Sequence, residues 1–325
     1  MGGLNLKSSN IVVCVGEILI DFFCTDFDID LKLGTHFVKQ AGGAPANVSI
    51  AISKLGGRAL FAGKVGDDPF GHYLKETLQG FQVDTSMLSH DPNSSTTLAF
   101  VSLKSDGERD FTFHQGADLL LTVDELDINR MMQAKIIHFG SATSMLGGPA
   151  FTTYFKVMAL ARENGIFVSF DPNFREFLWR GRREEFRERA LKAISIADFV
   201  KVSEDELKLI SGTEDINHGV NILHQYGSKM IVVTLGKQGS LISNGDQSKI
   251  VSSIRVITVD TTGAGDAFVG ATLFQLSQKE FPGKVIYDFE EFKRIAAFSN
   301  KAAALVCTRI GAITALPSYD EVENF

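Results

Sequence analysis

The sequence predicts an α/β fold: a doubly wound, mainly parallel sheet flanked by helices, with a small β-sheet lid. Three observations predict it. From Ala134 onward, continuous apolar runs alternate with helical segments, as in a parallel sheet covered on both faces. The runs at 96–103 and 108–114 alternate apolar and polar residues instead, which is typical of strands with one solvated face. The stretch 258–270 joins β-branched residues, a glycine turn and an apolar helical segment.

The expected elements follow in chain order after a loose tail at residues 1–10. Strands are predicted at 11–15, 59–63, 136–139, 166–170, 199–202, 230–235 and 256–259, and helices at 45–55, 69–80, 149–164, 183–197, 216–226, 266–276 and 290–305. Hairpins are expected at Asp106-Gly107 and Asn244-Gly245. The hairpin at 96–114, joined by strands near 18–23 and 36–38, forms the lid, which we place at roughly 17–40 and 96–115. Because no linker or repeat interrupts the sequence, we expect a single domain over residues 1–325.

Charge and cysteine content exclude several classes of protein. The formal net charge of −7 argues against a nucleic-acid binder, which usually carries a basic footprint. The three cysteines are odd in number and lack CxxC spacing, so a reduced, cytoplasmic setting is expected. No run reaches the roughly 18 apolar residues of a membrane span.

The glycine turn at 263–265 is the strongest candidate for an anion site. The first N–H groups of a helix lack intrahelical acceptors and lie at the positive end of its dipole, where phosphate binds. Asp266 follows directly. Its carboxylate either caps the helix or takes a proton from an attacking hydroxyl, and the spacing alone leaves both readings open. Neither a nucleotide P-loop nor a dinucleotide fingerprint matches the sequence here or elsewhere.

Further polar residues fall where predicted strands end, and in an open α/β sheet these ends form the ligand site. They are Asp21, Asp171, Asn173, Arg175, Glu206, Thr234 and Asp266. Asn47 lies in a first helical turn just after Gly42-Gly43. Each of these two residues has a structural explanation that is as good as a substrate contact. Asp21 could form an ion pair, and Asn47 could cap its helix. Together the residues suggest a site for a polyhydroxyl substrate and a polyphosphate.

These motifs resemble those of the PfkB, or ribokinase-like, carbohydrate kinases, and the fructokinases among them most. The segment D-T-T-G-A-G-D-A-F at 260–268 is similar to one family signature, and G-G-A-P-A-N at 42–47 with G-D-D-P-F-G at 66–71 is similar to the other. The segments G-E at 16–17, D-P-N-F-R at 171–175, T-L-G at 234–236 and T-R-I-G-A at 308–312 also match in family order. The resemblance covers nearly the whole chain.

The resemblance implies an ATP-dependent sugar kinase with roles for individual residues. Asp266 would be the general base, and the N–H groups of Gly263, Ala264 and Gly265 would form the anion hole, with Arg175 near the transferred phosphoryl. The implied sugar contacts are Asp21, Gly42, Gly43, Asn47, Phe100, Phe113, Asn173, Arg175 and Asp266.

The resemblance also implies nucleotide and metal sites. The nucleotide residues would be Ser203, Glu206, Thr234, Gly236, Gly239, Gly263, Gly265 and Asn300. The family motif N-x-x-E appears as S-E-D-E at 203–206, so Glu206 keeps its indirect link to Mg²⁺ while Ser203 replaces Asn. Asp260, Thr262 and the backbone at Gly311 match a K⁺ site.

Substrate choice follows from the lid. Related 2-keto-3-deoxygluconate kinases hold the sugar acid with Tyr and Arg where this chain has Phe113 and Gln115, so a neutral sugar, first D-fructose, is expected. Ribose, aminoimidazole riboside or another nucleoside remain alternatives within the family, and phosphofructokinase remains open. An inactive sugar or nucleotide sensor is the non-enzyme alternative. A homodimer through the lid is expected, as in family dimers.

Overall fold

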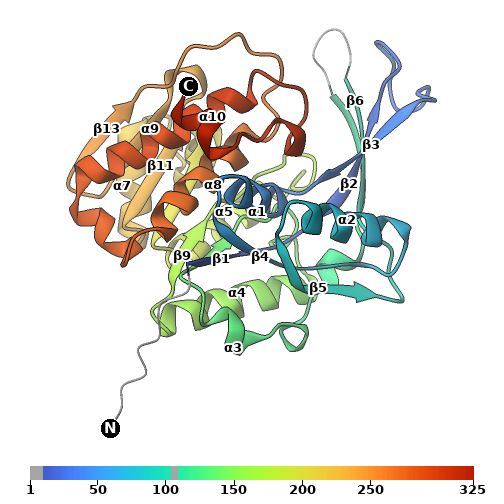
Figure 1. The fold of residues 1–325 in the computed structure, drawn as a ribbon, viewed down its shortest axis with the longest axis horizontal. Helices are drawn as coiled ribbons and strands as arrows, with labels where there is room; N and C mark the ends of the chain where they lie inside the picture. Colours follow the sequence, from blue (N-terminus) through green and yellow to red (C-terminus); the bar gives the residue numbers. More distant parts are fainter. Residues whose placement is uncertain (1–9, 104–108) are drawn as a thin grey trace.

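The computed structural model describes residues 10–103 and 109–325, and two sheets organise this part of the chain (Figure 1). The larger sheet has nine strands in the described residues, in the order β13-β12-β11-β10-β9-β8-β1-β4-β5. In chain order these are β1 (Ile11–Val15), β4 (Arg58–Gly66), β5 (Asp84–Asp91), β8 (Ile136–Phe139), β9 (Phe167–Phe170), β10 (Phe199–Ser203), β11 (Met230–Thr234), β12 (Ser240–Ser243) and β13 (Ser248–Val251). All neighbouring pairs are parallel except β11–β12 and β12–β13.

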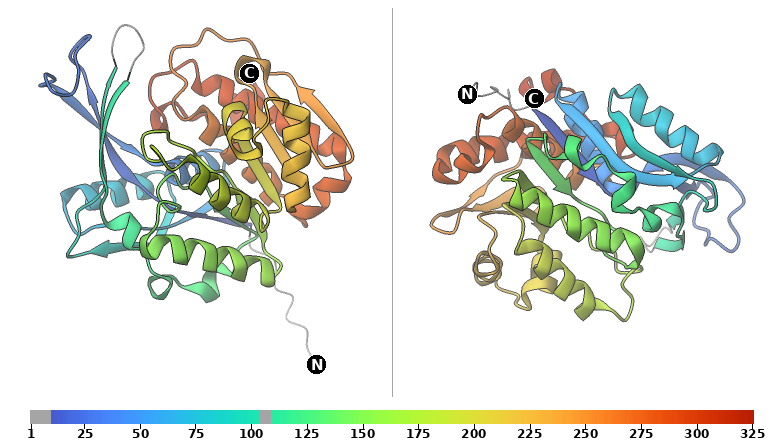
Figure 2. Two further views of the ribbon diagram at one scale, coloured as in Figure 1. Left: turned by 180° about the vertical axis from the view of Figure 1, so that it is seen from behind. Right: turned by 90° about the horizontal axis from the view of Figure 1, so that it is seen from below.

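Helices cover both faces of this sheet, as the view from below shows (Figure 2). They are α1 (Ala44–Lys54), α2 (Pro69–Gly80), α3 (Ile128–Met131), α4 (Gly148–Glu163), α5 (Arg183–Ile194), α6 (Glu204–Ser211), α7 (Ile216–Tyr226), α8 (Ala264–Ser277), α9 (Phe289–Val306) and α10 (Tyr319–Glu323). In β1, Val13 and Val15 pack into the core that contains α4 and α5, whereas Val12 and Cys14 pack into the core that contains α1 and α8. The strand is a continuous apolar run because both of its faces are buried.

The smaller sheet is the expected lid, in the strand order β3-β2-β6-β7 (Figure 1). Its strands are β2 (Leu19–Cys24), β3 (Phe37–Gly42), β6 (Leu98–Leu103) and β7 (Arg109–His114). The β6–β7 register sets Ala99 opposite Phe113 and Val101 opposite Phe111. These four residues border one face of the lid.

The chain reverses its direction of travel across the larger sheet between β1 and β8. From β1 it runs outward through β4 to β5, returns to β8 on the other side of β1, and continues through β9 and β10. Such a switch point opens a crevice at the carboxyl ends of the two strands, where ligands bind in open α/β sheets. The switch point and the lid therefore place the site at the same edge.

The fold class is confirmed, and some local predictions are not. Residues 256–259 form no strand: Ile257 is 88% exposed, and the segment belongs to neither of the two sheets. The prediction failed because β-branched residues favour a strand only where a pleated surface receives them. Strand β5 and helix α6 were not predicted. The hairpin tip Asp106-Gly107 and almost all of the expected tail lie outside the described residues.

None of the described helices combines the length and hydrophobicity that crossing a membrane requires.

Candidate active site

A cavity of about 2080 Å³ lies at the carboxyl ends of the parallel strands and below the lid. Its walls come from β2, β6 and β7 of the lid, from the loops after β9 and β10, and from the start of α8. The predicted site residues that line it are Asp21, Gly42, Gly43, Asn47, Phe113, Asn173, Arg175, Ser203, Glu206, Asp260, Thr262, Gly263, Gly265 and Asp266. The structure thus brings together most of the residues that the sequence singled out.

Helix α8 begins at the cavity because Gly263 allows a turn that other residues rarely adopt. Gly263 is the N-cap with φ +78°, and a Cβ there would lie 2.9 Å from Cβ of Ala312. The N–H groups of this first turn point away from the helix, toward the cavity end. The Ala264 N–H donates to the carbonyl of Thr261 at 3.2 Å, so of the three predicted anion-hole donors this one already has an acceptor.

Asp266 and Asn47 meet because α1 and α8 pack very closely. A Cβ on Gly270 would lie 2.5 Å from Cβ of Ala51, so only glycine permits this approach. One turn earlier on both helices, Asn47 Nδ2 donates to Asp266 Oδ2 at 2.8 Å, and both side chains are buried. Asn47 Oδ1 has no hydrogen-bond partner among the described residues, so it can accept a bond from a ligand. Neither side chain caps its own helix.

Burial and nearby cations set the protonation of the two acids that face the cavity. Burial raises the pKa of Asp266, whereas the hydrogen bond from Asn47 and the charges of Arg175 and Lys201 oppose that rise. Burial also raises the pKa of Asp21 to about 7, against the pull of Arg175. A carboxylate with a raised pKa is a stronger base, which suits Asp266 for accepting a proton from a hydroxyl.

Lys201 is the main site residue that sequence reasoning missed. It lies inside the apolar strand β10, lines the cavity, and its Nζ is 3.0 Å from Asp171 Oδ2. Burial raises the pKa of Asp171 to about 6, and the surrounding carboxylates of Asp171, Glu206 and Asp266 raise that of Lys201. The ammonium also lies 3.1 Å from where a Cβ on Gly265 would stand, which places positive charge beside the start of α8. A charged residue within an otherwise apolar strand was the available signal.

Glu206 organises the loop after β9 instead of facing the cavity with free oxygens. Its Oε2 accepts from the Ser203 N–H at 2.7 Å and its Oε1 from the Phe174 N–H at 2.8 Å, while Ser203 Oγ accepts from the Glu206 N–H. Ser203 and Glu206 thereby form a capping box at α6. The same loop turns through Asn173, whose φ is +47° and whose Nδ2 donates to the Gly140 carbonyl at 2.7 Å. The loop then presents Arg175 to the cavity.

A second buried acid, Glu17, lies at the switch point and was not predicted as a site residue. Ser141 Oγ donates to its Oε2, and the Thr143 hydroxyl, 3.3 Å from the same oxygen, donates to Asp118 Oδ2 at 2.6 Å. Burial raises the pKa of Glu17 to about 7. Glu17 and Thr143 line the cavity, so this network holds β1 and β8 together beneath the site.

Asp260 ties the segment before α8 to the segment after α9. It accepts from the Thr262 N–H and hydroxyl at 2.9 and 2.7 Å through Oδ1, and from the Gly311 N–H at 2.9 Å through Oδ2. The three residues predicted for K⁺ are thus adjacent. Gly311 itself does not line the cavity.

Other predicted residues lie outside the cavity. Thr234 ends β11, Gly236 and Gly239 follow it, and none of the three lines the cavity. Asn300 on α9 donates to the Val251 carbonyl at 2.9 Å. Phe100, predicted as a sugar contact, does not line the cavity, and contrary to the prediction it does not share a face with Phe111 and Phe113. It lies on the opposite face of the lid, stacked on Phe22 with centroids 5.0 Å apart, because β6 alternates and Ala99 and Val101 take the cavity side.

Comparison with known proteins decides the family. The model of the pfkB family carbohydrate kinases matches residues 9–319. The chain belongs to this family. Fructokinase-1 of Zea mays is 42% identical over 315 residues, which cover 96% of each chain.

Solved structures of other PfkB kinases share the fold over nearly the full length. The fructokinase of Xylella fastidiosa with bound ATP has a TM-score of 0.89 and 34% identity over 97% of this chain and 98% of that one. A double mutant of fructokinase from Vibrio cholerae, with fructose, ADP and potassium ion bound, has a TM-score of 0.84 and 32% identity over 98% of both chains. The resemblance inferred from the motifs is confirmed, and the protein is a carbohydrate kinase.

Proposed function

We propose that this PfkB kinase transfers the γ-phosphoryl group of ATP to the C6 hydroxyl of D-fructose. One observation carries the proposal: the buried Asp266 carboxylate, hydrogen-bonded by Asn47, lies at the start of α8 in a cavity that also holds Arg175 and Lys201. A base, an anion-binding helix start and two cations are the groups that phosphoryl transfer requires. The fructokinase names of the relatives above support fructose as the acceptor.

In this proposal each group acts on one part of the reaction. Asp266 accepts the proton as the sugar hydroxyl attacks, and Asn47 fixes the orientation of its carboxylate. The N–H groups at Gly263 and Gly265, with Ala264 after release from Thr261, stabilise charge on the transferred phosphoryl. Arg175 and Lys201, which also line the cavity, add positive charge, and the Lys201 ammonium lies beside the start of α8. Asp21 and Asn47 recognise sugar hydroxyls, and Gly42 leaves room for the Asp21 carboxylate, since a Cβ there would lie 2.0 Å from Asp21 Oδ2.

ATP would extend from the start of α8 toward Thr234, which ends β11, and toward Gly236 and Gly239, which follow this strand. Mg²⁺, which neutralises the phosphates when bound, fits an indirect link to Glu206, because both carboxylate oxygens already accept N–H bonds. K⁺ fits the oxygen-rich junction of Asp260, Thr262 and the Gly311 backbone. The bound ATP, ADP and potassium of the neighbouring fructokinases support these sites.

Substrate specificity tests the fructose assignment. An anionic sugar would meet the Asp21 carboxylate, and the lid offers Gln115 and Phe113 where a cation would be needed. We expect kcat/KM to be higher for D-fructose than for 2-keto-3-deoxygluconate or fructose 6-phosphate. The rates for the three sugars are measured side by side at saturating Mg-ATP and with K⁺ present. A preference for either anionic sugar would overturn the assignment. Faster turnover of ribose or aminoimidazole riboside would instead indicate a sister branch of the family, and no ADP formation with any of the sugars would indicate an inactive sensor.

The lid should close on the sugar and exclude water from the phosphoryl group. Phe111 of β7 already contacts Phe177 across the cavity, with ring centroids 3.8 Å apart. We expect fructose to slow hydrogen exchange in β6 and β7, and the variant Phe177→Ala to show less of this protection. Equal exchange with and without fructose in these strands would argue against closure.

The same lid supports the proposed homodimer. Phe27, Leu33 and Val38, which lie in or beside its first two strands, are exposed apolar side chains that a second copy could cover.

Residues 1–325 form one domain in this proposal. In the sequence, two lid strands precede α1 and two follow it, and among the described residues the lid has no hydrophobic core separate from that of the main sheet.

A further inference from the structure

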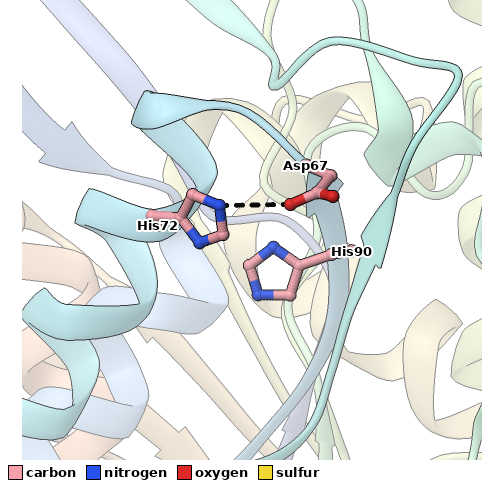
Figure 3. A group of neighbouring side chains, drawn as sticks. All are labelled: Asp67, His72 and His90. Atoms are coloured by element: carbon pink, nitrogen blue, oxygen red, sulfur yellow. Dashed lines mark ion pairs between the residues drawn. The ribbon is translucent and has the colours of Figure 1, made fainter.

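A group of two histidines and one aspartate lies apart from the active-site cavity, at the outer edge of the larger sheet (Figure 3). Asp67 follows β4, His72 is in the first turn of α2, and His90 is near the end of the edge strand β5. One potential ligand atom from each residue lies within 4.8 Å of the other two. It is the one such group found in the described residues.

The contacts within the group already resemble a coordination set. His72 Nε2 is 3.1 Å from Asp67 Oδ1, and the rings of His72 and His90 stack with centroids 5.0 Å apart. Four ligands about 2.0–2.1 Å from zinc stand roughly 3.3–3.4 Å from one another in a tetrahedron. The pair His72–Asp67 has nearly this spacing, and both side chains are about half exposed, so they can adjust without disturbing the core.

His90 supplies an independent indication of a missing ligand. Its Nδ1 is buried and has no hydrogen-bond partner among the described residues, whereas buried polar atoms in folded proteins almost always have one. Figure 3 shows a nitrogen of this ring turned toward His72 and Asp67.

The backbone around the group is fixed independently of any ligand. The Asp67 N–H donates to the Asp91 carbonyl at 2.8 Å, next to His90. Asp68 caps α2 through the N–H groups of Phe70 and Gly71, and it also binds the N–H of Thr96 at the root of the lid. Three anchored segments therefore hold the three side chains in register, which reduces the ordering that a metal would otherwise impose.

We propose that Asp67, His72 and His90 form a binding site for a divalent transition metal such as Zn²⁺. Imidazole and carboxylate ligands favour Zn²⁺, Ni²⁺ or Cu²⁺ over Mg²⁺, which requires several oxygen ligands. The exposed side of the group leaves a fourth position for water. The metal would join β4, α2 and β5 beside the root of the lid.

The test is a Zn²⁺ titration of the EDTA-treated, nucleotide-free protein by calorimetry. We expect one site per chain that excess Mg²⁺ does not displace, and loss of that site in His72→Ala and Asp67→Ala. The Zn²⁺ affinity should fall by more than the roughly 10- to 100-fold that is typical when a group hydrogen-bonded to a metal ligand is removed.

The chain also offers a matched control. His36 and Asp26 form another His–Asp pair, 2.8 Å apart, in which His36 is exposed and which has no third ligand in the described residues. Zn²⁺ binding should survive His36→Ala, and a crystal soaked in Zn²⁺ should show an anomalous peak among Asp67, His72 and His90. Wild-type-like binding by His72→Ala, or no Zn²⁺ binding by the wild type, would overturn the proposal. Each variant's unfolding midpoint without metal, close to wild type, establishes that it is folded.

Discussion

Asp266→Asn is expected to fold normally and to lose at least about a hundredfold in kcat, because the amide cannot accept the hydroxyl proton. The substitution keeps the size of the side chain, and its contact with Asn47 can be retained by either amide oxygen. The measurement is kcat with saturating D-fructose and Mg-ATP. Since the ionised form of Asp266 is the active base and burial raises its pKa, the wild-type rate should fall on acidification at a higher pH than an ordinary aspartate would give.

Asp205→Asn is the matched control for this prediction. Asp205 is also an acid in a first helical turn beside the cavity, but it is exposed and lies on α6 away from Asn47. Its kcat should stay close to that of the wild type. If Asp266→Asn turned over fructose as fast as Asp205→Asn, the carboxylate would be a structural acid and the base would have to be another group.

Lys201→Met should lower the free energy of unfolding by roughly 3–5 kcal/mol, the range typical of removing one partner from a buried ion pair. Both Lys201 and Asp171 are buried, and the ammonium is the cation that offsets the Asp171 carboxylate at 3.0 Å. Without it, the carboxylate keeps its desolvation cost and gains nothing in return. The double variant Lys201→Met/Asp171→Asn should recover much of the loss, because no unpaired charge remains. Urea denaturation followed by circular dichroism measures both changes.

Lys293→Met serves as the comparison for that loss. Lys293 pairs with Glu290 at 2.7 Å on the surface of α9, where the pair is solvated and contributes at most about 1 kcal/mol. Equal destabilisation by the two lysine variants would show that burial of the Lys201 pair has no energetic consequence. A double variant no more stable than Lys201→Met would show that the loss comes from packing instead of charge.

The larger sheet was predictable because its strands are buried on both faces. Runs such as 11–15 and 230–234 are continuous apolar segments, and the glycines and polar residues between them mark the turns. Residues 256–259 have the same β-branched composition, yet no strand among the described residues pairs with them, and Ile257 and Val259 are exposed. Composition alone carries no information on whether a neighbouring strand is available.

The reacting end of the site was predictable for a related reason. Each of the two helix starts is marked in the sequence by glycines and a nearby polar residue. Gly263 and Gly265 precede Asp266, and Gly42 and Gly43 precede Asn47. That these starts meet depends on Gly270 packing against Ala51, a contact between residues far apart in the sequence. Lys201 was missed because its partner Asp171 comes from the neighbouring strand end.

In the lid, the face of the sheet on which a side chain lies depends on how β6 and β7 pair. Phe100, Phe111 and Phe113 look alike in the sequence, but the β6–β7 pairing puts Ala99 and Val101 beside the two later phenylalanines. Phe100 therefore faces Phe22 on the other side of the sheet. A shift of this register by one residue would reverse every face.

The most direct measurement of the central claim is identification of the product. Uniformly ¹³C-labelled D-fructose incubated with the protein, Mg-ATP and K⁺ should give fructose 6-phosphate as the one sugar phosphate, with one ADP formed for each, by ¹³C and ³¹P NMR. A phosphate at C1, or ADP released without any sugar phosphate, would contradict the account.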